Sequence, residues 1–353
     1  MKKIRQFASI LMLAAAVVFA AGCTKPDDPS NGDNGGNDNG GGNNEEPTSV
    51  TIRANTPSMV KLTNARLGAV ATVPDDSKYV NIGICWGIEE NPTPTWGNSI
   101  FAEEGVLSFD TLVFKFDPGT TYHVRAFVRY NGEELYSDDV SFTTVSVTDM
   151  SIYESISGHP YVDLGLPSGT KWAVYNVGAF SPIEYGSYFA WGETVEKSEC
   201  TWDNYKFGNY IQDDSPSKYN NSDKLLTLEP EDDAVSVNWM GGWRTPTSAE
   251  CYELRDNVLH KAWVTVGEVS GALMTFANGN SLFLPAGGRK EATVGWNNIY
   301  CCYGTSTHPT YSEEINSFQW SMMELSITQY DGPKIQSLMR DSGYSYRGVH
   351  AAK

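Results

Sequence analysis

The residues with the most reactive side chains are four cysteines in the second half of the chain, Cys200, Cys251, Cys301 and Cys302. A catalytic or metal-binding cysteine acts as its thiolate, and paired thiols must also converge on one point. Cys301 and Cys302 are adjacent, which is poor spacing for two ligands of one ion. In an exported chain the four thiols can form disulfides, a vicinal bridge among them, or stay reduced, and the sequence does not select a pairing. We predict structural roles for all four.

An acidic run in the middle of the chain offers carboxylate oxygens, the ligands that calcium prefers. The run contains Glu229, Glu231, Asp232 and Asp233, with Pro230 inside it. A proline followed by acidic residues is also typical of a helix N-terminus, where the helix dipole favours negative charge. We favour this second interpretation, expect a short helix to begin at Pro230, and predict no bound metal.

Established catalytic motifs are missing from the sequence. It contains no Gly-x-Ser-x-Gly, Walker or His-Glu-x-x-His pattern, and its five histidines are scattered. A pair of glycosidase carboxylates is not identifiable by spacing among 43 acidic residues. We therefore predict that the protein is not an enzyme and holds no cofactor.

Aromatic residues are the remaining candidates for function, and they suit binding better than catalysis. The chain has 10 Trp and 19 Tyr, and such side chains stack on sugar rings and anchor protein interfaces. Most of the tryptophans stand in motifs that look structural. Trp296 and Trp320 lie in the less regular last third of the chain, and we expect these two to be exposed and to contact a ligand.

Composition and charge limit the class of protein and of partner. The 353 residues are 40% hydrophobic, which is enough for packed cores in two or three domains. The 25 basic and 43 acidic residues give a net charge of −18, which repels phosphate backbones and argues against a nucleic-acid partner. High Gly, Pro, Tyr and Trp contents favour an exported protein that is rich in strands and loops.

The amino terminus carries the features of an export signal. Lys2, Lys3 and Arg5 precede an uncharged run over 7–22 that is too short for a comfortable membrane span. The run ends in Ala-Ala-Gly before Cys23, and this resembles the signal peptide and lipobox of bacterial lipoproteins. The resemblance implies that residues 1–22 are removed and that Cys23 carries the acyl chains, palmitate included.

Residues 23–48 are expected to form a flexible stalk behind the acylated cysteine. Within them, 31–44 contain only Asn, Gly and Asp, so no apolar surface is present to be buried. The segment 24–28, Thr-Lys-Pro-Asp-Asp, resembles the export signal of surface lipoproteins of Bacteroidota-type bacteria. The resemblance implies an outer-membrane lipoprotein that is lipid-anchored and exposed at the cell surface.

Residues 49–147 alternate apolar and polar residues in short segments, which predicts a β-sandwich. In the clearest strand, over 122–130, Tyr122 and every second residue share one face, and Asn131-Gly132 then forms a hairpin turn into a strand over 135–142. The segment around Phe-Asp-Pro-Gly-Thr-Thr-Tyr, which ends at Tyr122, resembles a fibronectin type III domain. The resemblance makes Tyr122 the corner tyrosine, whose hydroxyl bonds the backbone across the turn. The domain is either a ligand-binding module or a spacer.

Residues 153–350 resemble the Fibrobacter succinogenes major paralogous domain. The resemblance rests on four segments, 161–172, 189–193, 228–234 and 241–247. The last of these, Gly-Gly-Trp-Arg-Thr-Pro-Thr, is also similar to a segment of formylglycine-generating proteins, which implies an α+β, C-type-lectin-like fold.

A capped helix follows that last segment, and its residues are expected to be structural. Thr247 and Glu250 have the spacing of a capping box, which predicts a helix from residue 248. Trp243 and Arg244 precede it in the shared motif.

Together these features favour a surface lipoprotein that binds a glycan or a host protein and takes part in adhesion. Two alternatives remain open at the level of the sequence. The protein is a structural or fimbria-associated surface component, or it is a formylglycine-generating-like or glycan-active enzyme.

Overall fold

The computed structural model describes residues 49–74, 80–208, 216–309 and 321–352. The predicted signal peptide and stalk, with Cys23, and Trp320 lie outside the described residues. Residues 46–353 belong to one compact unit. Among the described residues, no helix has the length and apolar character needed to cross a membrane.

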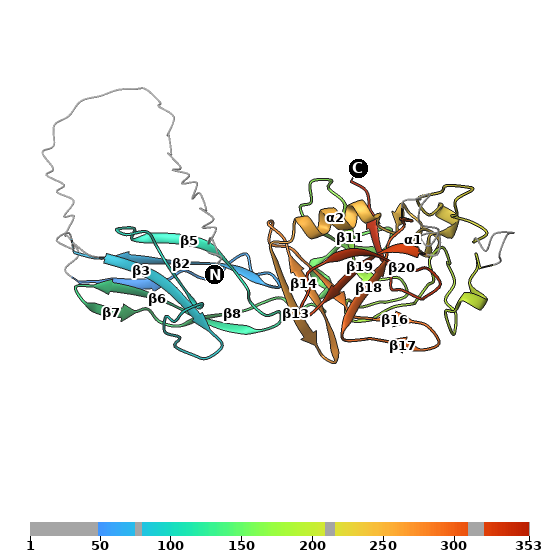
Figure 1. The fold of residues 1–353 in the computed structure, drawn as a ribbon. Coiled ribbons are helices and arrows are strands. Elements are labelled where there is room, and N and C mark those ends of the chain that lie inside the picture. Colours follow the sequence, from blue (N-terminus) through green and yellow to red (C-terminus); the bar gives the residue numbers. More distant parts are fainter. Residues whose placement is uncertain (1–48, 75–79, 209–215, 310–320, 353) are drawn as a thin grey trace, which may run out of the picture. The chain divides into compact units, whose positions relative to one another are not determined.

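The first part of this unit is a β-sandwich of two antiparallel sheets (Figure 1). One sheet has the order β1-β2-β5 and the other has the order β4-β3-β6-β7, with β8 also paired to β6. The strands are β1 (Thr51–Ala54), β2 (Asn64–Thr72), β3 (Val80–Gly87), β4 (Ser99–Phe101), β5 (Ser108–Phe114), β6 (Thr121–Tyr130), β7 (Glu133–Tyr136) and β8 (Val140–Thr143).

Strand β6 follows the predicted alternation, with Tyr122, Val124 and every second residue to Val128 buried between the sheets. Asn131 and Gly132 both have positive φ and form the two-residue turn into β7. The single strand expected over 135–142 was wrong. The chain breaks after β7 and returns as β8, and both strands pair with β6.

The second part is also dominated by strands, arranged in several small sheets. A five-stranded sheet has the order β12-β21-β11-β10-β9, and two three-stranded sheets are formed by β13-β14-β15 and β18-β19-β20. The strands are β9 (Glu154–Ile156), β10 (His159–Asp163), β11 (Lys171–Asn176), β12 (Trp243–Arg244), β13 (His260–Val266), β14 (Val269–Thr275), β15 (Ser281–Pro285), β16 (Arg289–Lys290), β17 (Val294–Gly295), β18 (Tyr300–Gly304), β19 (Ser321–Thr328), β20 (Lys334–Met339) and β21 (Arg347–His350).

Helices are few in the part of the chain that the structure describes. The α-helices are α1 (Ala234–Trp239) and α2 (Ser248–Asp256), and short 3-10 turns occur at Met150–Ile152, Trp202–Asn204 and Pro230–Asp232. The C-type-lectin-like α+β arrangement stays a prediction.

The junction between the sandwich and the second part is a packed, hydrogen-bonded contact. Leu62 and Val147 form an apolar cluster with Leu273 and Phe283. Beside it the hydroxyls of Thr63 and Thr275 share a buried hydrogen bond of 2.8 Å, and Thr63 also bonds Ser281 at 3.2 Å. Asn64, which is fully buried, donates its amide to the Gly279 carbonyl at 2.7 Å. These contacts hold both parts together.

Candidate functional site

A cavity of about 250 Å³ lies on one face of the sheet β18-β19-β20. Strand alternation decides which residues face it, because neighbouring residues in a strand point to opposite sides. Cys301, Leu325 and Ile327 point into an apolar core on one side of the sheet. The side chains on the other face of the sheet line the cavity. On this face Cys302 is paired with Ser326 and Glu324 is paired with Gln336 across neighbouring strands. Tyr300 and Leu338 lie next to these pairs.

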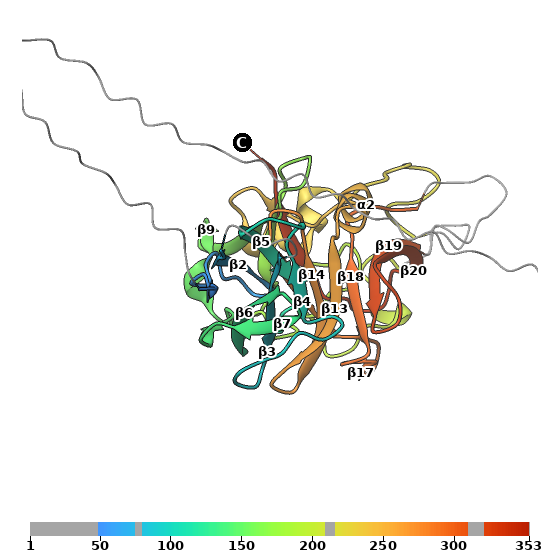
Figure 2. The ribbon, with the colours of Figure 1, turned by 90° about the vertical axis from the view of Figure 1, so that its left-hand side faces the viewer.

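The hairpin formed by β16 and β17 is labelled in Figure 1, and β17 is labelled again in Figure 2. Arg289 of β16 and Trp296, which follows β17, complete the lining of the cavity. Gly288 allows the end of this hairpin to close. It has φ of 66°, and a Cβ there would lie 2.0 Å from the carbonyl oxygen of Gly295. Asn298 then fixes the following turn, because its side-chain oxygen accepts hydrogen bonds from the Ser270 amide and the Tyr185 hydroxyl, both at 2.8 Å.

The mouth of the cavity is aromatic. Trp296 is 60% exposed and Tyr300 is 36% exposed. Their rings meet edge to face with centroids 6.1 Å apart. Trp296 has φ of 65°, a backbone conformation that bulky residues rarely adopt. Two large rings therefore stand at the surface, Trp296 on the turn after β17 and Tyr300 at the start of β18.

The buried carboxylate of Glu324 lines the cavity. The residue is fully buried, and within the described part of the chain neither of its oxygens has a hydrogen-bond partner of normal geometry. Burial raises the pKa of this carboxyl to about 7, although contacts with the Cys302 thiol, Arg289 and the Gln336 amide act in the opposite direction. Because buried polar groups in proteins are nearly always paired, a carboxylate without a normal hydrogen bond next to a cavity is the strongest sign of a binding site among the described residues.

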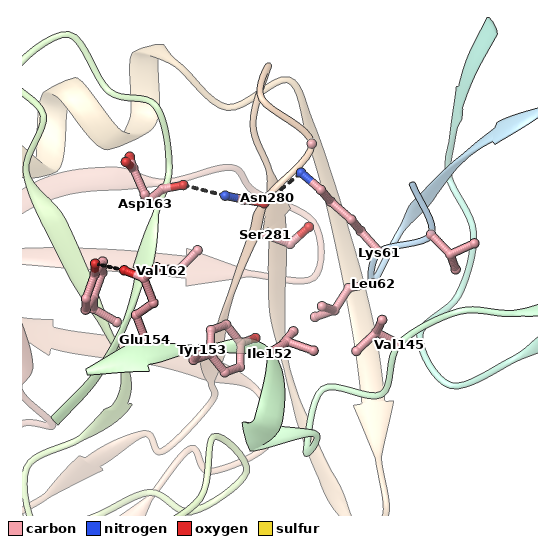
Figure 3. Close-up of a pocket in the computed structure, with 13 residues that line it drawn as sticks. Lys61, Leu62, Val145, Ile152, Tyr153, Glu154, Val162, Asp163, Asn280 and Ser281 are labelled. Carbon is pink, nitrogen blue, oxygen red and sulfur yellow. Dashed lines mark hydrogen bonds between the residues drawn. The ribbon is translucent and has the colours of Figure 1, made fainter. Parts of the chain in front are cut away.

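A second cavity, of about 380 Å³, lies at the junction with the sandwich (Figure 3). Lys61 donates hydrogen bonds to the Asn278 carbonyl and to the side-chain oxygen of Asn280, both at 2.8 Å. Asn280 in turn donates to the Asp163 carbonyl at 2.7 Å. The polar groups on this wall bond one another, so the cavity is explained by the joining of the two parts of the chain.

The described cysteines are all reduced and buried. Cys301 donates its thiol to the Leu284 carbonyl at 3.2 Å, and burial raises its pKa to about 12. Burial also raises the pKa of the Cys302, Cys251 and Cys200 thiols. Cys301 and Cys302 lie on opposite faces of β18, so their sulfurs do not converge.

The acidic run is involved in internal contacts. Asp232 accepts hydrogen bonds from Lys206, Lys218 and the Tyr219 hydroxyl. Asp233 accepts one from the Val235 amide and caps α1, which begins four residues after Pro230. Among the described residues, no group of three or more His, Cys, Asp or Glu side chains is arranged to hold a metal ion.

The residues expected to be structural lie in well-defined contacts. The Tyr122 hydroxyl accepts a hydrogen bond of 2.9 Å from the Asp117 amide. Thr247 and Glu250 form the capping box of α2, and Arg244 makes two hydrogen bonds, of 2.7 and 2.6 Å, with the Glu250 carboxylate. Trp243 is buried and donates its ring nitrogen to the Ile156 carbonyl at 3.0 Å.

Sequence reasoning found Trp296 but missed the other groups around it. Glu324 interrupts the otherwise uncharged segment Met-Met-Glu-Leu-Ser-Ile over 322–327, and this was the available signal. A single charge inside an apolar strand indicates either an exposed edge or a buried functional group. Arg289 and Tyr300 carry no comparable signal.

Comparison with known proteins gives only weak structural likenesses. No family model matches the chain. No curated protein matches it. Among solved structures, the sensor domain of the anti-sigma factor RsgI4 from Pseudobacteroides cellulosolvens is 23% identical, with 28% of this chain and 99% of that chain covered and a TM-score of 0.23. A fibronectin type III domain of the human KIAA0970 protein is 15% identical, with 31% and 79% covered and a TM-score of 0.21. The β-sandwich assignment therefore rests on the strand pairing described above.

Proposed function

We propose that this protein is a surface lipoprotein that binds a glycan without catalysis, through the cavity between Trp296 and Glu324. The observation that carries the proposal is the combination of an exposed aromatic mouth with a buried, unpaired carboxylate. A sugar ring presents an apolar face, which suits the rings of Trp296 and Tyr300. Its hydroxyls donate and accept hydrogen bonds, which suits Glu324, Gln336 and Arg289.

The same cavity supports a binding role over an enzymatic one. Glycoside hydrolysis needs two carboxyl groups on opposite sides of the scissile bond, and Glu324 is the one carboxylate among the described residues that line this cavity. A formylglycine-generating-like activity needs reactive thiols, and burial raises the pKa of both Cys301 and Cys302. Among the described residues that line this cavity, the groups that either chemistry requires are missing, which supports the binding role.

The proposed location rests on the amino terminus. The basic segment, the apolar run and Cys23 support lipid anchoring, and the segment 24–28 supports export to the outer surface. Replacing Cys23 by Ser should release the protein from the membrane fraction or leave it unprocessed. A Cys23→Ser protein that still fractionates with membranes, together with a wild type that mass spectrometry shows to lack acyl chains, would contradict the anchoring proposal.

The glycan proposal is tested with the chain from residue 24 onward, without lipid, on a glycan array. We expect binding that the Trp296→Ala variant loses by at least tenfold. Trp96→Ala is the matched control, because Trp96 is fully exposed on the sandwich and should contribute nothing. Absence of binding to every glycan would refute the proposal and favour a structural surface component. Equal losses in both variants would show that the cavity is not the site.

A further inference from the structure

Glu324 differs from every other deeply buried acid in the described part of the chain. Three further acids are buried to a similar degree, Glu193, Asp232 and Asp233. Glu193 accepts hydrogen bonds from Lys197 and the Lys206 amide. Asp232 is bonded by two lysines and a tyrosine, and Asp233 by backbone amides and a threonine hydroxyl. Glu324 has no partner of normal hydrogen-bond geometry. It has only weaker contacts with the Cys302 thiol, Arg289 and the Gln336 amide, and an incompletely compensated buried carboxylate is costly.

A cation would supply what the Glu324 carboxylate lacks. Arg289 is the cationic side chain that lines the cavity, but its guanidinium forms a 2.9 Å ion pair with Glu291 instead. A ligand ammonium that entered the cavity would supply both the opposite charge and the hydrogen bonds that the carboxylate lacks.

The mouth of the cavity and the charge of the chain favour the same kind of ligand. The faces of Trp and Tyr attract cations through their ring quadrupole, and this effect adds to the stacking of an apolar ring face. The net charge of −18 raises the local concentration of positively charged ligands. A neutral sugar gains from stacking and from hydrogen bonds of its hydroxyls, whereas a sugar with a free amine gains in addition from its positive charge.

We propose that the cavity binds an amino sugar, a hexosamine unit with a free ammonium, whose ring stacks on Trp296 and whose ammonium pairs with Glu324. This inference rests on the proposed glycan-binding function and names the ligand class of the same site. The volume of about 250 Å³ suits one such unit better than a longer segment.

Ligand binding should be coupled to the proton on Glu324. An ammonium favours the ionised carboxylate, so binding releases the proton that Glu324 holds below pH 7. The other titratable groups that act on this carboxyl are Arg289, the Cys302 thiol and, more weakly, the Tyr344 hydroxyl. The ligand amine must also stay protonated. We therefore expect the affinity for an amino sugar to fall from neutral pH to pH 5.5, as Glu324 takes up its proton, and to fall again at alkaline pH, as the ligand amine loses its own.

The test compares two ligands of the same backbone, the β-linked glucosamine hexamer, which carries ammonium groups, and its fully N-acetylated counterpart, in which neutral acetamides replace them. The Glu324→Gln variant then separates the effect of charge from that of the added acetyl groups. Binding of the chain from residue 24 onward is measured by calorimetry. We expect the glucosamine hexamer to bind at least tenfold more tightly than the acetylated hexamer. Glu324→Gln should abolish this preference, and Trp296→Ala should weaken both ligands. Glu133→Gln, at an exposed position on β7, is the control and should change neither affinity.

The outcomes separate the inference from the function on which it rests. Equal binding of both hexamers, with the expected loss in Trp296→Ala, would overturn the amino-sugar inference and leave glycan binding in place. Failure of both hexamers together with a silent glycan array would overturn both proposals. Binding of a lysine-rich peptide, lost in Glu324→Gln and not matched by the glucosamine hexamer, would show that the cavity serves a protein ligand. Glu324→Gln removes a buried charge, so it should fold at least as well as the wild type.

Discussion

The stability of the second part of the chain should depend on pH through Glu324, and the Glu324→Gln variant isolates this dependence. The carboxyl has its pKa raised from 4.5 to about 7 in the folded protein. Between these two pH values the folded state holds a proton that the unfolded state has released. Stability contributed by this proton is therefore present at low pH and is lost as the pH rises toward 7.

The size of this effect follows from the same two pKa values. For each pH unit over which only the folded state holds the proton, the unfolding free energy changes by about 1.4 kcal/mol. The wild type should thus lose about 3 kcal/mol of unfolding free energy between pH 4.5 and 7, and no more above it. Glutamine has no proton to lose, so the variant should match the wild type near pH 4.5 and exceed its stability by about 3 kcal/mol at pH 8.

Urea unfolding followed by tryptophan fluorescence measures this difference, because eight of the ten tryptophans lie in the second part of the chain. The comparison is made at pH 5 and pH 8, with Glu133→Gln as the control whose difference from the wild type should not change with pH. A stability difference for Glu324→Gln that is the same at both pH values would refute the reasoning. So would a variant that is less stable than the wild type at pH 8, because that result would require a native partner for the carboxylate.

Two further predictions concern residues with structural roles. Tyr122→Phe should lower the unfolding free energy of the sandwich by about 1–3 kcal/mol, because it leaves the Asp117 amide without its hydrogen bond. Tyr330→Phe removes a hydroxyl at a position that is 92% exposed and serves as the control. An equal effect of both changes would contradict the role of Tyr122. The described thiols should not react with a disulfide reagent at pH 8 in the native protein and should react only in denaturant. Burial excludes the reagent and raises the pKa of the thiols. Rapid labelling of Cys301 or Cys302 in the native state would contradict this prediction.

Features that depend on a few neighbouring residues could be predicted from the sequence. The alternation in β6, the Asn131-Gly132 turn and the capping box of Thr247 and Glu250 are local, and the structure contains all three. The opposite orientation of Cys301 and Cys302 also follows from strand geometry once residues 300–304 are known to form a strand.

Features that depend on distant segments could not be predicted in this way. Glu324 is buried because the hairpin β16–β17, some thirty residues earlier in the chain, completes the cavity beside the sheet that contains β19. No local pattern in Ser321–Thr328 indicates that a distant hairpin will pack beside this strand and bury Glu324. The junction is similar, because Thr63 and Asn64 meet residues more than two hundred positions away.

The dimensions of the cavity limit how tightly one molecule of this protein can bind. Pockets for small ligands usually measure roughly 300–1,000 Å³, and this one is slightly smaller, at about 250 Å³. A stacked aromatic pair contributes about 0.5–1.5 kcal/mol beyond the area it buries. Binding must also offset several kcal/mol of lost translational and rotational freedom. A single site should therefore bind weakly, and strong attachment would require many copies acting on one glycan, as a chain displayed on a stalk at the cell surface would allow. If the protein is displayed in many copies at the cell surface, as proposed, weak binding by each molecule is sufficient for strong attachment of the cell.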